Sequence, residues 1–348
     1  MIRRNPVALG SLLAIALAFA VAGLAYVIAP DHSPYANRMT VEIEGKPPGY
    51  RQLFLLLPYK HPQNATLLQR LWSGAPDSCA YLPITAWTRK GDSILVDKYV
   101  DEGITEPQSY PSNRTHLYTQ RFWLGTDRFG RDVLSRLIVG TRVSLSVGLV
   151  AVALSLTIGI VLGALGGYYR GRLDRVIVWF MNIVWSIPTL LLVFAVTFAL
   201  GKGFWQVFVA VGLTLWVNVA RTLRGQVLAV RGLAYVEAGR ALGFSDARII
   251  FRHILPNVLG PLLVVAASNF ASAIVIEAGL SFLGVGVQPP EPSWGLMIKE
   301  NYPFIITHNP SLALVPGVAI MVLVLAFNLL GNGLRDALDV RSYFSEYL

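Results

Sequence analysis

Few residues in this chain have the types and spacing that covalent chemistry requires. The strongest candidate is the stretch Gly125–Asp132, which comes close to the G-x4-G-K-[ST] pattern of phosphate-binding loops. Arg131 stands where that pattern has lysine, and Asp132 replaces the hydroxyl that binds magnesium. Because the carboxylate of Asp132 would repel a phosphate, we expect no ATP binding at this stretch.

Other catalytic and metal-binding patterns are missing from the sequence. It contains no H-E-x-x-H, C-x-x-C or G-x-S-x-G motif, and Cys79 is its only cysteine. None of the five histidines has a metal-ligand partner three or four positions further on. We therefore predict neither a catalytic site nor a metal site, and we expect that the chain is not an enzyme.

A few polar side chains interrupt long apolar stretches. The candidates for lining a path through a membrane are Asn182, Asn218, Ser268, Asn269 and Glu277. Polar groups in lipid either join helices by hydrogen bonds or line a wet path, and both interpretations stay open here. Glu277 either caps a helix end or places a charge at the mouth of the path. With so few ionisable groups at membrane depth, a carrier driven by protons or sodium is disfavoured.

The composition points to lipid as the main solvent. The 348 residues are 54% hydrophobic and 14% charged, with a mean hydropathy of +0.54, whereas soluble domains carry about 25% charged residues. The net charge of +9 is not massed on one stripe, so we expect no nucleic-acid partner. We predict an all-α membrane protein with six transmembrane helices, at Val7–Ala29, Val143–Tyr169, Val176–Leu200, Phe204–Ala220, Val258–Ile276 and Ser311–Leu334.

The basic residues predict the orientation. Arg3 and Arg4 precede the first apolar stretch, which is too long for a signal peptide and is expected to stay as an anchor. Thirteen lysines and arginines fall on the side of the N-terminus, against only Lys202 and Lys299 in the short loops of the other side. Both termini are therefore predicted to be cytoplasmic.

The predicted regions follow from this topology. They are an anchor helix at 1–30, an extracytoplasmic insert at 31–121, an interfacial amphipathic segment at 122–142, a five-helix core at 143–340 with a cytoplasmic loop at 221–257, and a cytoplasmic tail at 341–348. The insert is rich in proline and has strand-like pieces at Arg51–Leu57 and Ser93–Val100. In the interfacial segment, Arg131, Asp132, Ser135 and Arg136 share one helical face opposite apolar residues, as in a helix that lies on a membrane surface.

The cytoplasmic loop is too patterned for a simple connector. We predict a short helix over Leu233–Leu242 that ends at Gly243, because glycine accepts the left-handed conformation of helix ends. Ser245 is placed to cap a second helix that runs to about Ile254, and Pro256 marks a break or the start of the next span. The loop is either an amphipathic connector facing lipid or a docking surface for a protein. The arginines around the acidic Glu237 favour the docking surface.

This loop resembles the E-A-A-x3-G-x9-I-x-L-P motif of ABC importer permeases. The matching residues are Glu237, Ala238, Gly243, Leu255 and Pro256, while Gly239 replaces the second alanine and His253 replaces isoleucine. The ending His-Ile-Leu-Pro-Asn is similar to the peptide and nickel branch. Further stretches are similar to the DppC/OppC type, namely Leu124–Asp127, Gly130–Arg136, Gly140–Leu145, Leu280–Gly284, Ser293–Gly295 and Gly333–Asp339.

The resemblance implies a type I ABC importer permease of a bacterial inner membrane, transporting di- or oligopeptides. It implies that Glu237, Ala238, Gly239, Gly243, His253, Leu255 and Pro256 couple the chain to ATPase subunits. The implied partners are a second homologous permease, two ATP-binding subunits and an extracytoplasmic substrate-binding protein. This chain would carry no cofactor, since ATP is bound by the partners. Nickel or another small solute is the alternative substrate, and a self-contained channel or ion-coupled carrier is the alternative of another class.

Overall fold

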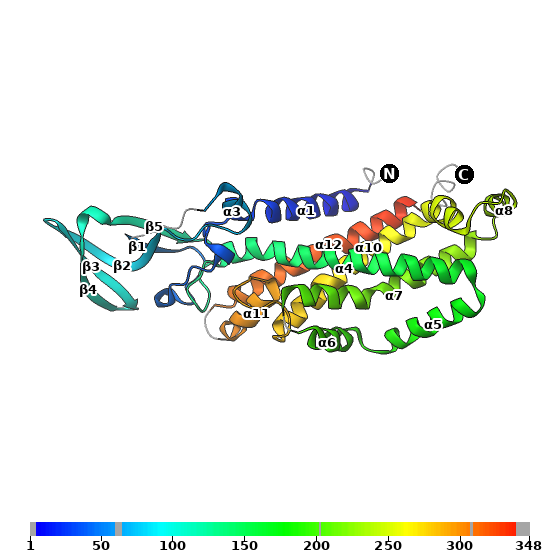
Figure 1. The fold of residues 1–348 in the computed structure, drawn as a ribbon. Helices are drawn as coiled ribbons and strands as arrows, with labels where there is room; N and C mark the ends of the chain where they lie inside the picture. Colours follow the sequence, from blue (N-terminus) through cyan, green and yellow to red (C-terminus); the bar gives the residue numbers. More distant parts are fainter. Residues whose placement is uncertain (1–4, 60–64, 202, 307–308, 339–348) are drawn as a thin grey trace. The chain divides into compact units, whose positions relative to one another are not determined.

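The computed structural model describes residues 5–59, 65–201, 203–306 and 309–338 (Figure 1). The predicted tail at 341–348 and the basic residues Arg3, Arg4 and Lys202 lie outside the described residues. In chain order the helices and strands are α1 (Pro6–Gly23), α2 (Ala25–Ile28), β1 (Tyr50–Pro58), α3 (Leu67–Trp72), β2 (Cys79–Lys90), β3 (Ser93–Asp101), β4 (Ile104–Pro111), β5 (His116–Phe122), α4 (Val133–Tyr169), α5 (Gly171–Ser186), α6 (Thr189–Leu200), α7 (Phe204–Val230), α8 (Ala234–Ala241), α9 (Asp246–Arg248), α10 (Leu259–Phe282), α11 (Trp294–Asn301) and α12 (Ser311–Leu338).

Five helical runs among the described residues are long and apolar enough to cross a membrane. They are α1, α4, α7, the run Asp246–Phe282 and α12, and the bent pair α5 and α6 makes up to six. The predicted span Val176–Leu200 is this pair, which is bent by 95°. Ile187 is extended there, at φ −90° and ψ 129°, because a proline at 188 disfavours helical backbone in the residue before it. The prediction of a helical, multi-pass membrane protein is confirmed.

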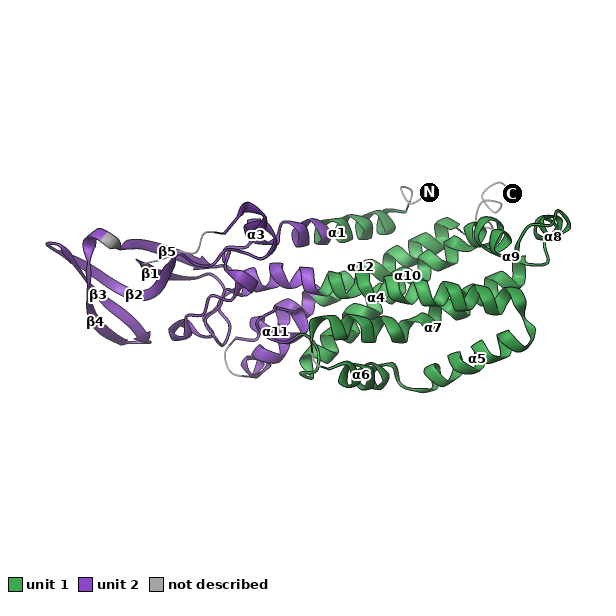
Figure 2. Ribbon diagram, viewed as in Figure 1, with its two compact units in different colours: residues 1–18, 144–287, 320–348 green, residues 19–143, 288–319 purple. Residues whose placement is uncertain are grey.

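The chain forms two compact units (Figure 2). The first holds residues 1–18, 144–287 and 320–348. In it, Gly159, Gly163 and Gly167 of α4 face α7, and a Cβ built on any of them would come within 2.4 to 2.7 Å of an α7 atom. Only glycine permits this approach of two helix backbones, and small residues spaced by four commonly allow such contacts between membrane helices.

The second unit holds residues 19–143 and 288–319 and contains an antiparallel five-stranded sheet in the order β4-β3-β2-β1-β5. The two predicted strand-like pieces, Arg51–Leu57 and Ser93–Val100, correspond to β1 and β3, so the prediction of these strands is confirmed. Alternate side chains of β1 point to opposite faces of the sheet. Phe54 packs with Ile43 and Phe122 in one cluster, while Leu55 packs with Ile84 in another.

The segment 122–142 does not form the separate surface helix that the sequence suggested. β5 ends at Phe122, and α4 begins at Val133 and continues through residue 142 without a break. The polar face that was expected to meet solvent is buried, since Arg131, Asp132, Ser135 and Arg136 are at most 3% exposed. The sequence shows a charged face opposite an apolar one, as an amphipathic helix does. Here, however, the charged side chains form ion pairs inside the second unit.

A buried charge cluster accounts for that pairing. The Arg131 guanidinium donates to Asp127 Oδ2 at 2.6 Å and to Glu300 Oε2 at 2.5 Å. The Arg136 guanidinium lies 3.5 Å from Glu300 and 3.7 Å from Asp127, and Asn37 Oδ1 accepts from both arginines. Two arginines and two carboxylates make the cluster neutral, as buried ions require. We call these four charged residues the charge cluster.

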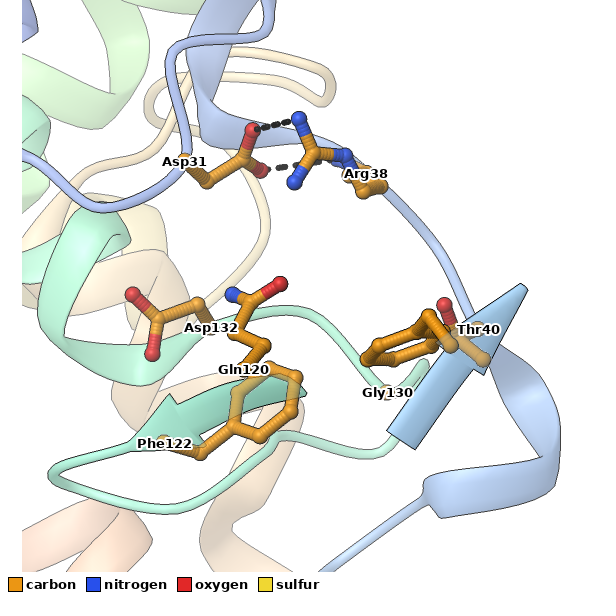
Figure 3. Close-up of a pocket in the computed structure, with 8 residues that line it drawn as sticks. Asp31, Arg38, Thr40, Gln120, Phe122, Gly130 and Asp132 are labelled. Atoms are coloured by element: carbon orange, nitrogen blue, oxygen red, sulfur yellow. Dashed lines mark hydrogen bonds and ion pairs between the residues drawn. The ribbon is translucent and has the colours of Figure 1, made fainter. Parts of the chain in front are cut away.

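The stretch Gly125–Asp132 is a tightly packed loop that contributes Asp127 and Arg131 to this cluster. Gly130 has φ +69°, and a Cβ there would lie 1.7 Å from the Thr40 carbonyl oxygen, so no other residue fits. A cavity of about 10 Å³ lies next to the loop (Figure 3), which is space for no more than about one water molecule. It is lined by Asp31, Arg38, Thr40, Phe54, Gln120, Phe122, Gly130 and Asp132.

Candidate functional site

The predicted helix–turn–helix is present between α7 and α10. Its first helix is α8, and the predicted end residues Leu233 and Leu242 are its caps. Gly243 has φ +72° and donates its N–H to the Arg240 carbonyl at 2.9 Å, while the Phe244 N–H reaches the Gly239 carbonyl at 3.0 Å. These two bonds form a Schellman motif, so the predicted glycine stop is confirmed with its mechanism.

The second helix begins as the sequence indicates. Ser245 caps α9 by accepting from the Arg248 N–H at 3.4 Å. A π-helical turn (Ile249–Ile254) and a 3-10 turn (Leu255–Val258) then lead into α10. Pro256 lies in the first turn of the 3-10 helix, where its missing N–H leaves no bond unmade. The loop between α7 and α10 thereby leads into a candidate membrane span, within the helical run Asp246–Phe282.

The candidate coupling residues divide into an outward and an inward set. The exposed ones are Glu237, Ala238, Gly243 and Pro256. Leu242, which the sequence analysis did not single out, is 72% exposed beside them. Glu237 also lies in the first turn of α8, where a negative charge is favourable for the helix dipole. The outward set thus combines one carboxylate with small and apolar groups around a sharp turn.

The inward set surrounds Phe244. Gly239 is buried, and a Cβ there would meet Phe244 at 3.5 Å. The His253 ring stacks on the Phe244 ring with centroids 5.6 Å apart, and the Arg248 guanidinium lies 4.1 Å from the same ring. Leu255 packs on the adjoining hydrophobic cluster. Sequence reasoning missed Phe244, although an apolar residue directly after a helix-ending glycine is the usual companion of the Schellman motif.

A hydrophobic cluster fixes the loop to the spans. It contains Ala164 and Tyr168 of α4, Val219, Leu223 and Val227 of α7, Val236 of α8, Ile249, Ile250 and Ile254 of the π-helical turn, Val258, and Leu262 of α10. Close-packed interiors are poorly compressible, so a displacement of α8 has to move its neighbours. The cluster therefore holds α8 to α4, α7 and α10.

Tyr168, on the last turn of α4, contacts three parts of the loop. Its hydroxyl donates to Asp246 Oδ1 at 2.7 Å and accepts from Arg240 Nε at 3.4 Å. Arg231 donates to the Tyr168 carbonyl oxygen at 2.7 Å. The sequence gives no signal for these contacts, because Tyr168 and Asp246 are 78 residues apart.

The candidate path-lining residues also fall into two sets. Asn182, Asn218 and Ser268 are exposed, whereas Asn269 and Glu277 are buried, at 2% and 0% exposure. The Asn269 amide donates to Ser155 Oγ at 3.3 Å and to the Leu215 carbonyl at 3.2 Å. Asn269 therefore joins α4, α7 and α10 by hydrogen bonds, which is the helix-joining interpretation of a polar residue in a span.

Glu277 closes the turn at the end of α10. The Ser281 hydroxyl donates to Glu277 Oε1 at 2.7 Å and accepts from the Val287 N–H at 3.0 Å. The backbone after Phe282 is thus folded back onto the helix. This geometry supports the capping interpretation of Glu277 over a charge at the mouth of a path.

Among the described residues, no three His, Cys, Asp or Glu side chains lie together in a group that could hold a metal ion.

Comparison with known proteins assigns the family. The family described as "Binding-protein-dependent transport system inner membrane component" matches residues 156–342, which include the whole loop between α7 and α10. The glutathione transport system permease protein GsiD of Pectobacterium atrosepticum is 43% identical over 62% of this chain and 72% of its own. The oligopeptide transport system permease protein OppC of Bacillus subtilis is 40% identical over 62% of this chain and 71% of its own. Among solved structures, the inward-facing MetNI methionine ABC transporter is 22% identical with a TM-score of 0.49, over 58% of this chain and 96% of that one. Since the family match spans more than half of its length, this chain belongs to the binding-protein-dependent transport system inner membrane components, as a permease subunit of an ABC importer.

Proposed function

We propose that this permease forms the path for di- or oligopeptides. The relatives are named for transport of glutathione, oligopeptides and dipeptides, which share a short peptide backbone. Asn182, Asn218 and Ser268 offer neutral donors and acceptors on exposed faces of the spans. A polar path with little charge suits a bulky substrate that passes without tight binding. Nickel or another small solute is the alternative cargo.

The energy enters through the coupling loop. The observation that carries this proposal is an α8 whose outward residues Glu237, Ala238 and Gly243 are exposed while its inner face packs on α4 and α7. Two ATP-binding subunits would dock on these residues and on Pro256, and they would bind the ATP. Gly239, His253 and Leu255 hold the docking surface in shape. A second homologous permease, in a type I arrangement, and an extracytoplasmic binding protein complete the transporter.

The docking proposal is tested by Gly243→Asp in the assembled transporter. The added side chain and charge should abolish ATP-dependent peptide uptake while membrane insertion stays normal. Gly103→Asp is the matched control, because Gly103 also has positive φ, at +79°, and no atom within 4 Å of a built Cβ, but lies in the insert. If Gly243→Asp transports as well as Gly103→Asp does, the turn is not a docking surface.

The proposed location is the bacterial inner membrane, with both termini cytoplasmic and the insert outside. Cys79, the only cysteine, is partly exposed on β2 of the insert and is a ready topology probe. A membrane-impermeant maleimide should label it in intact spheroplasts. In a Cys79→Ser background, Ser245→Cys should be labelled only after permeabilisation. The reverse pattern would refute the orientation.

The alternative class, a self-contained channel or ion-coupled carrier, makes the opposite prediction in reconstitution. The chain alone in vesicles should move no peptide, and uptake should appear only when the ATP-binding subunits, the second permease and ATP are added. Uptake by the chain alone would favour the alternative.

A further inference from the structure

The short helix α3 of the insert presents an apolar face that its own unit does not cover. Leu67, Leu68, Leu71 and Trp72 are 78%, 80%, 49% and 80% exposed. Positions i, i+1, i+4 and i+5 lie on one side of a helix, so these four side chains form a single stripe. The helix is well defined in spite of its exposure, because Thr66 and Gln69 form a complete capping box at its start.

Arg142 ties the end of α3 to the end of α1. Its guanidinium donates to the carbonyls of Leu71 and Trp72 at 3.0 and 2.7 Å, and to those of Ala22 and Gly23 at 2.5 and 3.0 Å. These are the last carbonyls of α3 and α1, which carry the negative ends of the helix dipoles. One side chain thus fixes both helix ends at the same level.

The point where Arg142 holds α3 and α1 together is the end of a candidate membrane span. α1 is a candidate span, and only 17% of its apolar window is buried by the rest of this chain. The same guanidinium lies 4.9 Å from the Tyr26 ring and 5.5 Å from the Trp72 ring. Tryptophan, tyrosine and arginine are the residues that gather where hydrocarbon meets headgroups.

We propose that α3 lies in the membrane interface and anchors the insert to the lipid surface. Its apolar stripe enters the boundary between headgroups and acyl chains on the side where α1 ends, continuing the lipid-facing surface of that span. Arg70 lies on the other side of α3 and remains among the headgroups, where its charge favours anionic lipid. The interaction goes beyond the transport function, since it determines where the insert sits and not what is carried.

Spin labels test the proposal in the full chain, reconstituted in vesicles of phosphatidylcholine and phosphatidylglycerol. In a Cys79→Ser background, Leu68→Cys places the label on the apolar stripe, and Arg70→Cys places a matched label on the opposite face. We expect the label at 68 to be several-fold less accessible to an aqueous nickel chelate and more accessible to oxygen, which dissolves in the acyl chains. Equal nickel accessibility at 68 and 70 would overturn the proposal. Shielding of position 68 from both reagents would also overturn it, because it would mean that protein covers the stripe.

The role of Arg142 is tested in the same assay. Arg142→Lys keeps the charge but cannot reach four carbonyls with one planar group, so the label at 68 should become several-fold more accessible to nickel. An unchanged profile in Arg142→Lys would show that the arginine does not hold α3 at the interface.

Discussion

The hydroxyl of Tyr168 donates a hydrogen bond to Asp246 Oδ1 at 2.7 Å, which joins the last turn of α4 to the first turn of α9. Around it, the hydrophobic cluster packs α8 against α4 and α7. A movement imposed on the coupling loop therefore reaches α4 by a polar and an apolar route. Removing the Tyr168 hydroxyl takes away its hydrogen bonds to Asp246 and Arg240, while the bond from Arg231 to the Tyr168 carbonyl remains.

Tyr168→Phe removes that hydroxyl and leaves the ring in the cluster. A hydrogen bond to a charged group contributes about 1.5–3 kcal/mol, so we expect a clear loss of coupling without loss of the fold. In the assembled transporter, peptide uptake per ATP hydrolysed should fall several-fold.

Two further variants control this experiment. Tyr59→Phe makes the same chemical change at an exposed tyrosine of the insert and should leave the ratio unchanged. Asp246→Ala combined with Tyr168→Phe should lose less than the sum of the two single changes, since both remove the hydrogen bond between these two side chains. Additive losses in the double variant would contradict the pairing.

The two glycines of the coupling loop should respond oppositely to alanine. Gly239 lies inside α8, where a Cβ meets Phe244 at an ordinary 3.5 Å, so Gly239→Ala should stabilise the protein by about 0.5–1 kcal/mol. Gly243 has φ +72°, and Gly243→Ala should destabilise by about 1–2 kcal/mol, because a Cβ clashes in left-handed backbone. Thermal unfolding in detergent measures both changes. Shifts of the same sign would show that the two backbone conformations are not those described.

Glu300 should be among the most sensitive charged residues of the second unit. Glu300→Gln leaves Arg131 and Arg136 buried with one carboxylate between them, and loss of a partner from a buried ion pair costs about 3–5 kcal/mol. Glu102→Gln is the surface counterpart, since the Glu102 side chain that pairs with Lys46 is 83% exposed, and it should cost at most about 1 kcal/mol. Denaturant unfolding of both variants gives the comparison. Similar losses would mean that the charge cluster is not shielded from water.

The structural features that the sequence predicts depend on residues that are close together in the chain. Gly243 as a helix stop and Ser245 as a cap follow from the conformational preferences of neighbouring residues, and both are observed. The pairing of Arg131 with Glu300 spans 169 residues, and nothing local announces it. For that reason the sequence pattern predicts a surface helix where the structure has a buried, ion-paired face.

The contrast between local preferences and contacts between distant residues also applies to the predicted spans and to the candidate path-lining residues. Hydropathy predicts one span at Val176–Leu200, whereas the structure has the bent pair α5 and α6 there, and the bend arises because Pro188 disfavours helical backbone at Ile187. Asn269 and Glu277 were identified as polar residues at membrane depth, but whether such a residue joins helices or faces a path depends on packing from distant parts of the chain. Both turned out to be buried.

Asp132 should make the folded protein less stable as the pH rises, which is opposite to the usual effect of a carboxyl group with a lowered pKa. Burial raises the pKa of its carboxyl from 3.8 to about 6, the negative charge of Asp31 adds to this, and hydrogen bonds from Ser135 oppose it. Asp132 Oδ1 has no hydrogen-bond partner among the described residues, so the ionised form is poorly compensated. Between pH about 4 and 6 the folded protein keeps a proton that the unfolded chain has lost. Stability from this group is therefore present at low pH and is lost as the pH rises through that window.

Asp132→Asn isolates this contribution, because the groups common to both proteins cancel in the difference. Asparagine resembles the protonated carboxyl, so the two proteins should be similarly stable near pH 4. The difference should then grow in favour of the variant up to pH 6 and level off, at no more than about 3 kcal/mol for a shift of this size. Unfolding free energies measured at a series of pH values check the shape of the curve. Parallel curves for the two proteins would show that Asp132 does not retain its proton in the folded state.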